Sequence, residues 1–170
     1  RLGRAAVERH RAAATGRSDG AELAGHLRRL ARVHALRGDH AESARLLREA
    51  LEALAVPDEH PILASTLVEL ARACAASGAR ADAAAHLERA WDLTIRHRPA
   101  GSKDWNVALV AYLGFLAGEG RRDAAAALLA DALPHLEATL GPDDYRTREA
   151  RGLLAEYTRS PDRATPEDEP

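Results

Sequence analysis

The feature that most constrains the fold is an internal repeat. Three stretches, 27–51, 67–91 and 109–133, align without gaps, and their glycines are 40 and then 42 residues apart. The aligned positions are Gly38, Gly78 and Gly120, then Ala44, Ala84 and Ala126, then Leu47, Leu87 and Leu129, then Ala50, Ala90 and Ala132. Self-similarity at a period of 20 to 50 residues is the sequence signature of stacked repeat architectures.

Each copy has the pattern of two helices joined by a tight turn. In the first copy, apolar residues recur at three- and four-residue spacing from Leu23 to His34, and again from Ala44 to Leu54. The glycine between the two runs is placed where a helix ends in the left-handed conformation. The chain holds 39 alanines and 23 arginines but only one phenylalanine, which favours helices over strands. The pattern predicts an all-α fold in which stacked helix pairs form a right-handed α-solenoid.

Breaks between the copies set the expected organisation. Helix-breaking and helix-capping residues cluster at 57–61, 97–102 and 141–144. We expect a single domain over 1–158, followed by a disordered tail at 159–170. Within the domain we expect an N-terminal helix at 3–14, repeats at about 22–55, 62–97 and 104–139, and a C-terminal capping helix at 144–158.

These residues resemble the tetratricopeptide repeat (TPR) consensus of large and small apolar positions. The matching residues of the first copy are Leu30, Ala31, His34, Gly38, Asp39, Ser43, Leu47, Ala50 and Leu51. The 40- and 42-residue periods are longer than the 34-residue standard and are similar to the kinesin-light-chain-type variety. The resemblance implies an antiparallel TPR-like superhelix whose concave groove, lined mainly by first helices, receives a peptide, a helix or another domain.

The resemblance also assigns positions to this groove. They are Arg28 and Arg32 in the first copy, Ser65, Val68 and Arg72 in the second, and Val107 and Val110 in the third. A groove that is basic at one end and apolar at the other suits an acidic or amphipathic partner segment. The alternative is a solvated charged face, in which the first-copy arginines pair with Glu42 and Glu49.

Reactive chemistry finds little support in the sequence. The eight histidines have no metal-ligand spacing, no phosphate-binding loop occurs, and the single cysteine, Cys74, occupies a packing position like His34. We therefore expect no enzyme activity, catalytic residue, metal or cofactor. Trp91 aligns with core leucines, whereas Trp105 is open to two interpretations, partner contact or packing.

The net charge and the hydropathy of the chain limit the kinds of partner that it can bind. A net charge of −2 provides no basic field for nucleic acid or an anionic membrane, and the apolar runs are too short to span a bilayer. One cysteine suits a reducing cytoplasm, and the alanine and arginine bias resembles that of a GC-rich bacterium. We expect a cytoplasmic protein- or peptide-binding module, the sensor or scaffold part of a larger bacterial regulatory protein such as a transcription factor, with its oligomeric state open. The alternatives are a small-molecule or peptide-pheromone receptor and an accessory domain of an enzyme.

Overall fold

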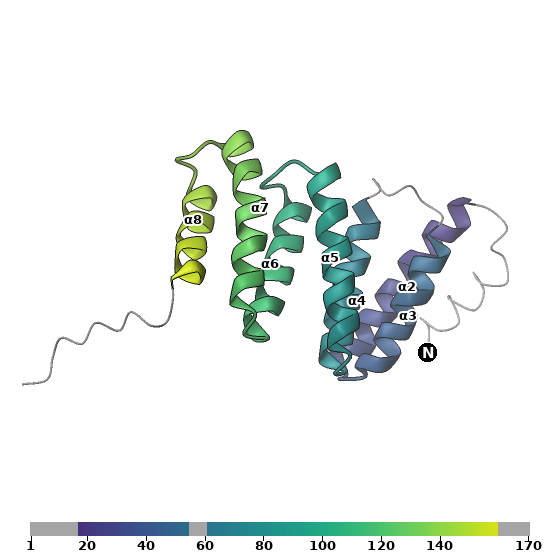
Figure 1. Cartoon of the computed structure of the whole chain (residues 1–170). Helices are drawn as coiled ribbons and strands as arrows, with labels where there is room; N and C mark the ends of the chain where they lie inside the picture. The colour runs from purple at the N-terminus through teal and green to yellow at the C-terminus, as the bar shows by residue number, and fades with distance from the viewer. Residues whose placement is uncertain (1–16, 55–60, 160–170) are drawn as a thin grey trace, which may run out of the picture. The chain divides into compact units, whose positions relative to one another are not determined.

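The computed structural model describes residues 17–54 and 61–159, and these residues form seven helices (Figure 1). The helices are α2 (Arg17–Leu36), α3 (His40–Ala53), α4 (Pro61–Ala76), α5 (Arg80–His97), α6 (Lys103–Gly118), α7 (Arg122–Leu140) and α8 (Tyr145–Thr158). The described residues contain no strand, so the predicted all-α class is confirmed. The expected helix at 3–14 and nearly all of the tail lie outside the described residues.

The chain divides into two compact units. Unit 1 holds α2 to α5, Ser102 and residues 103–112 of α6, while unit 2 holds residues 99–101, the rest of α6, α7 and α8. Within unit 1, α3 packs against α2 and α4, and α4 packs against α5. Within unit 2, α7 packs against α8. Each of these contacts joins helices that are adjacent in the sequence, as the repeat predicts, while the single-domain boundaries stay a prediction.

One turn geometry closes all three helix hairpins. Gly38, Gly78 and Gly120 have φ of 79°, 88° and 68°, in the left-handed region that favours glycine. In each turn, the amide after the glycine donates to the carbonyl five residues back, as Asp39 N does to His34 O at 2.9 Å. The glycine amide donates to the carbonyl three residues back. This pair of hydrogen bonds is a Schellman motif, which confirms the glycine C-caps predicted from the repeat.

The core of unit 1 is built from leucine and alanine around two tryptophans. Leu27, Leu46, Leu67 and Leu70 are fully buried. Trp105, at the start of α6, is 1% exposed. Its ring meets that of Trp91 edge to face, with centroids 5.1 Å apart and an interplanar angle of 64°. The partner-contact interpretation of Trp105 is therefore wrong, because the side chain is part of the core.

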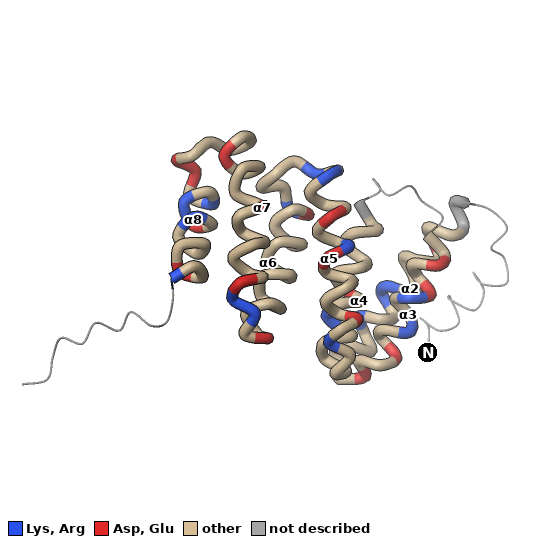
Figure 2. The backbone as a smooth tube through the Cα atoms, viewed as in Figure 1, with Lys and Arg blue, Asp and Glu red and all other residues tan. Residues whose placement is uncertain are grey.

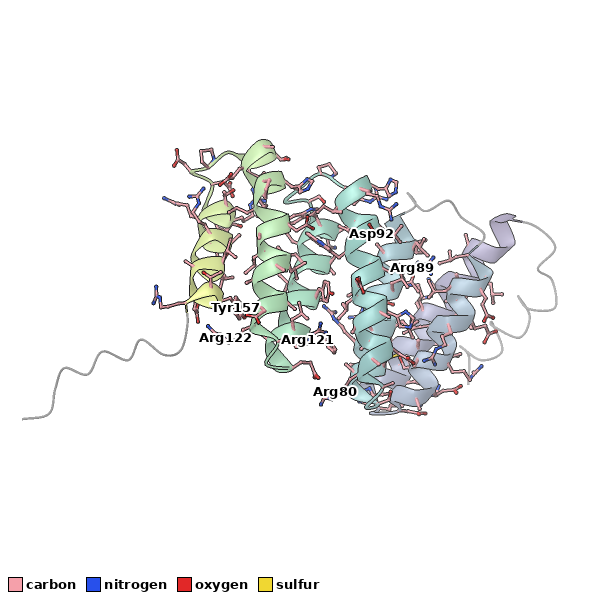
Figure 3. The ribbon with its side chains drawn as sticks, in the orientation of Figure 1. Arg80, Arg89, Asp92, Arg121, Arg122 and Tyr157 are labelled. Carbon is pink, nitrogen blue, oxygen red and sulfur yellow. The ribbon has the colours of Figure 1, made fainter. Side chains whose placement is uncertain are left out.

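In unit 2, two arginines hold α8 in place. Arg146 donates to Asp144, which caps α8, and to the Gly101 carbonyl at 3.1 Å, so it fastens the start of α8 to the 99–101 segment. The hydrogen bond from Arg146 lowers the pKa of Asp144. Arg122 of α7 lies over the Tyr157 ring, 5.4 Å from its centroid, and donates to the Glu156 carbonyl (Figure 3).

A pH dependence follows from His86 on α5. Burial disfavours the charged imidazole and lowers its pKa below the ordinary 6.5, and nearby Arg48 lowers it further, against the opposing effect of Asp82. Because the unfolded chain then binds the proton more readily, the stability conferred by neutral His86 is complete above the unfolded pKa and declines as pH falls below it.

We expect His86→Gln to reduce the loss of stability that the chain suffers between about pH 7.5 and about pH 5.5. Urea unfolding at the two pH values measures this. His97→Gln, at the exposed end of the same helix, is the matched control variant and is unfolded at the same two pH values. An identical pH dependence in wild type and His86→Gln would contradict the prediction.

Candidate interaction groove

A cavity of about 530 Å³ opens between three helices of unit 1. Its lining residues are Arg32 and Ala35 of α2, His40, Ser43 and Leu47 of α3, and Glu69, Arg72, Ala73 and Ala76 of α4. Its volume falls within the range of ligand pockets in proteins. Because α2 and α4 are the first helices of successive repeats, the cavity lies on the side where the sequence predicts a groove.

An ion pair across the repeats controls which charges are available at the cavity. Arg28 of α2 donates to both carboxylate oxygens of Glu69 on α4, at 3.2 Å and 2.7 Å. This two-point geometry is the strong form of an arginine–carboxylate pair. Glu69 is thereby neutralised, although it lines the cavity.

Arg32 and Arg72 are left as the available cations of the cavity. Both side chains are exposed, and neither has a hydrogen bond or ion pair among the described residues. They come from different repeats, so an anionic ligand would be held by two separate helices. An unpaired guanidinium can bind a carboxylate through two parallel hydrogen bonds.

The rest of the lining is mostly small and apolar. Ala35, Ala73 and Ala76 leave the cavity open, because a larger side chain at any of them would fill it. Leu47 and Ser43 of α3 are buried, and each presents part of its surface to the cavity. The cavity thus combines an apolar lining with two cations, a composition that fits an amphipathic ligand.

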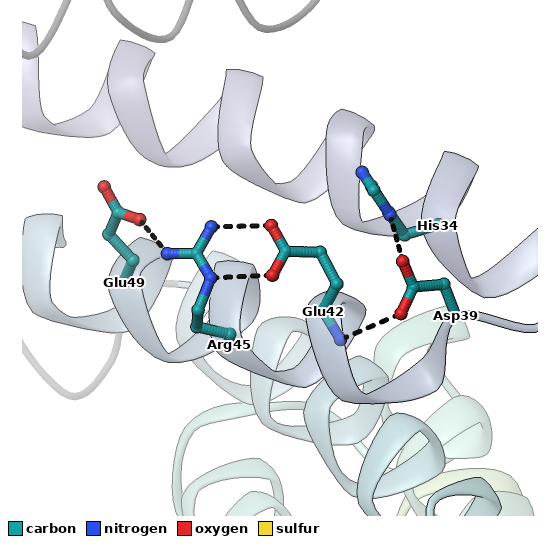
Figure 4. Close-up of polar contacts among 5 residues, drawn as sticks. All are labelled: His34, Asp39, Glu42, Arg45 and Glu49. Carbon is teal, nitrogen blue, oxygen red and sulfur yellow. Dashed lines mark hydrogen bonds and ion pairs between the residues drawn. The ribbon is translucent and has the colours of Figure 1, made fainter.

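The alternative pairing of the first-copy arginines with Glu42 and Glu49 does not occur among the described residues. Arg45 of α3 binds both carboxylates, at 2.7 Å and 3.3 Å, one turn away on the same helix (Figure 4). The hydrogen bonds that Arg45 donates to Glu42 raise the pKa of Arg45 further above its ordinary value. Since residues on the same helix satisfy these acids, they are not the partners of Arg28 or Arg32.

The predicted apolar end of the groove needs one correction. Val68 is 2% exposed and belongs to the core of α4, so it is not accessible to a ligand. Ser65 is half-buried and donates to the Ile62 carbonyl. Val107 and Val110 are 37% and 66% exposed, on a helix that carries no charge after its first turn (Figure 2).

Sequence reasoning missed part of the cavity lining. His40, Ser43 and Leu47 come from a second helix, whereas the family resemblance pointed only to first helices. Their apolar spacing within α3 places Ser43 and Leu47 on its buried face, but a cavity beside that face is visible only in three dimensions. Glu69 was missed because its partner, Arg28, is 41 residues away.

The described part of the chain offers neither a metal-binding cluster nor a membrane-spanning helix. Over residues 17–54 and 61–159, no group of three His, Cys, Asp or Glu side chains is placed to hold a metal ion. Cys74 is buried, and burial raises the pKa of its thiol. None of the described helices has the length and apolar character needed to cross a bilayer.

Paired antiparallel helices with identical turns, and a groove between successive first helices, define a helical-hairpin repeat protein. Comparison with known proteins gives the kind of repeat: a family model described as tetratricopeptide repeat matches residues 22–94. The chain thus has a TPR-like repeat structure, and TPR domains generally act as protein–protein interaction modules, typically without catalysis.

Solved structures agree with this fold. The chain is similar to the crystal structure of nearly identical TPR-like repeats of a Podosopora anserina kinesin light chain, with 22% identity, a TM-score of 0.70, and coverage of 91% of this chain and 77% of that one. A single-substitution variant of the same repeats gives 22% identity, a TM-score of 0.70 and coverage of 91% and 76%. Among curated proteins, none matches.

Proposed function

We propose that unit 1 binds an acidic, amphipathic segment of a partner protein in the cavity between α2, α3 and α4. The observation that carries this proposal is that Arg32 and Arg72, on neighbouring repeats beside an apolar lining, have no partner within residues 17–54 and 61–159. A carboxylate of the segment binds the two guanidinium groups, and a small aliphatic side chain beside it enters the cavity. Arg28 has a positioning role, because it neutralises Glu69, which would otherwise repel the carboxylate.

We expect the double variant Arg32→Glu and Arg72→Glu to weaken this binding at least about tenfold, or about 1.4 kcal/mol. The probe is a fluorescein-labelled synthetic peptide that alternates glutamate with valine or leucine, titrated by fluorescence anisotropy. Wild-type affinity should fall when the salt concentration rises from about 50 mM to about 200 mM, because the attraction between exposed charges is screened.

The matched control is the double variant Arg80→Glu and Arg89→Glu. It reverses the same number of exposed arginines, both on α5 (Figure 3), and neither of them lines the cavity. Circular dichroism should give the same helicity for both variants, since surface substitutions have small effects on stability. Equal loss of binding in the two variants would mean that only net charge matters, and would reject the cavity as the binding site.

The wider role that we propose is that of a cytoplasmic sensor or scaffold module in a larger bacterial regulatory protein, without catalytic activity, cofactor or direct contact with nucleic acid or membrane. The composition favours a bacterial source, and the net charge of −2 disfavours nucleic acid. The second candidate is a receptor for a small amphipathic molecule or a peptide pheromone. The cavity volume favours it, and binding of an uncharged apolar ligand, unaffected by salt, would select it.

A further inference from the structure

The side of α2 next to the groove carries two exposed large apolar side chains. Leu36 and Val33, one turn apart, are 81% and 42% exposed, and Leu36 is the most exposed large apolar side chain of the described residues. They share a stripe with Arg29, at spacings of four and three residues, and Arg37 follows directly. We call these four residues the α2 ridge.

The α2 ridge lies beside the groove on another face of α2. The cavity-lining residues of α2 stand at 32 and 35, and the ridge residues stand at 29, 33, 36 and 37. One residue is a rotation of about 100° around a helix, so Val33 faces a different direction from Arg32. Arg32 is three residues after Arg29 and four before Leu36, so it borders the ridge as well as the cavity.

The charge of the α2 ridge has one sign. The side chains of Arg29 and Arg37 are exposed and have no hydrogen bond or ion pair among the described residues. The nearest acid beyond the ridge, Asp39, is held by His34 at 2.9 Å (Figure 4). Two aliphatic side chains between two unpaired arginines form a surface complementary to an apolar stripe flanked by carboxylates.

We propose that the α2 ridge is a second docking surface, and that its partner is an amphipathic helix whose aliphatic stripe is flanked by glutamate or aspartate. Helix-on-helix packing suits the ridge, because exposed aliphatic side chains on one helix fill the grooves between side chains of another. The chain itself does not offer this combination at its ends. Residues 1–16 carry four arginines and one glutamate, the same sign as the ridge, and residues 160–170 are acidic but contain no large aliphatic residue.

The test uses two synthetic peptides of about 18 residues, a length at which an alanine-based helix forms in water. Each carries leucines along one helical stripe, flanked by glutamates in the first peptide and by lysines in the second. Both carry fluorescein, and each is titrated with the full chain by fluorescence anisotropy. We expect the glutamate peptide to bind at least about tenfold more tightly than the lysine peptide, and equal affinities would refute an acidic partner.

Two variants locate the binding. The double variant Val33→Gln and Leu36→Gln removes the aliphatic pair. The double variant Arg29→Glu and Arg37→Glu reverses the charge. Each should weaken binding of the glutamate peptide at least about tenfold. All four side chains are exposed, so the helix should persist, and Leu36→Ala is a milder version of the first variant. Matched controls on α5 are Ala85→Gln, also exposed, and Arg80→Glu with Arg89→Glu, and both should leave the affinity unchanged.

Three other results would overturn the ridge proposal. Loss of binding in the Arg32→Glu and Arg72→Glu variant but not in the ridge variants would place the peptide in the groove, which leaves the proposed function intact. Loss in the controls as large as in the ridge variants would indicate attraction to net charge. A dimer in sedimentation experiments that dissociates in Val33→Gln with Leu36→Gln would make a second copy of this chain the occupant.

Discussion

Leu87→Ala should lower the free energy of unfolding of unit 1 by about 2 to 5 kcal/mol, because it removes a buried side chain and leaves a void that the helices only partly close. Leu87 lies on the buried face of α5, which packs against α4. Its counterparts in the other copies, Leu47 and Leu129, are also buried. The repeat therefore places a structural leucine at this position in each copy.

Tryptophan fluorescence during urea unfolding can measure this change. The chain has two tryptophans, Trp91 and Trp105, and both lie in unit 1, so the signal follows that unit alone. Glu88→Ala, next to Leu87 but exposed, is the control and should change stability by no more than about 0.5 kcal/mol. A loss well under about 1 kcal/mol in Leu87→Ala would contradict its burial between helices.

The second large effect is expected at Trp105, where two substitutions should differ sharply. Trp105→Ala removes the whole buried ring and its contact with Trp91, and should cost about 3 to 5 kcal/mol. Trp105→Phe keeps an aromatic ring and also removes the indole N–H, which is buried and has no hydrogen-bond partner. Because a buried unpaired donor is itself destabilising, the phenylalanine variant should lose less than about 1.5 kcal/mol.

Urea unfolding followed by the remaining fluorescence of Trp91 compares the two variants. Trp91→Phe is the companion substitution: it alters the other ring of the same pair, and Trp105 then reports. If Trp105→Phe were as destabilising as Trp105→Ala, the indole N–H would have to stabilise the fold. That result would contradict the prediction, because this N–H has no hydrogen-bond partner among the described residues. If all three variants were as stable as wild type, the placement of Trp105 in the core would be contradicted.

The fold was predictable because its determinants are local and repeated. Gly38, Gly78 and Gly120 each end a helix through their own backbone conformation, and the leucines that follow them at one spacing define the buried faces. Such signals lie within a single helix or turn. Comparison of the three copies then distinguishes these signals from alanine matches that occur by chance in an alanine-rich sequence.

The candidate site was predictable only in part, because its chemistry depends on contacts between distant residues. The sequence places Arg28, Arg32 and Arg72 on first helices, but it does not reveal that Glu69 occupies Arg28 and leaves the other two available. Val68 was misplaced for a related reason. An apolar residue near the edge of a helix face can line a groove or enter the core, and only the packing of the neighbouring helices determines which.

The three Schellman turns also show that one backbone geometry can be flanked by different side chains. Each hairpin is closed by main-chain hydrogen bonds and one glycine, and the side chains beside that glycine add contacts that differ between turns: Asp39 binds His34 and caps α3, whereas Ser77 donates to the Cys74 carbonyl. They differ accordingly: Arg37 and Asp39 flank the first, Ser77 and Ala79 the second, Glu119 and Arg121 the third. Hairpin tips are thus the places where new charge or new recognition elements can be acquired during evolution while the helices keep their register.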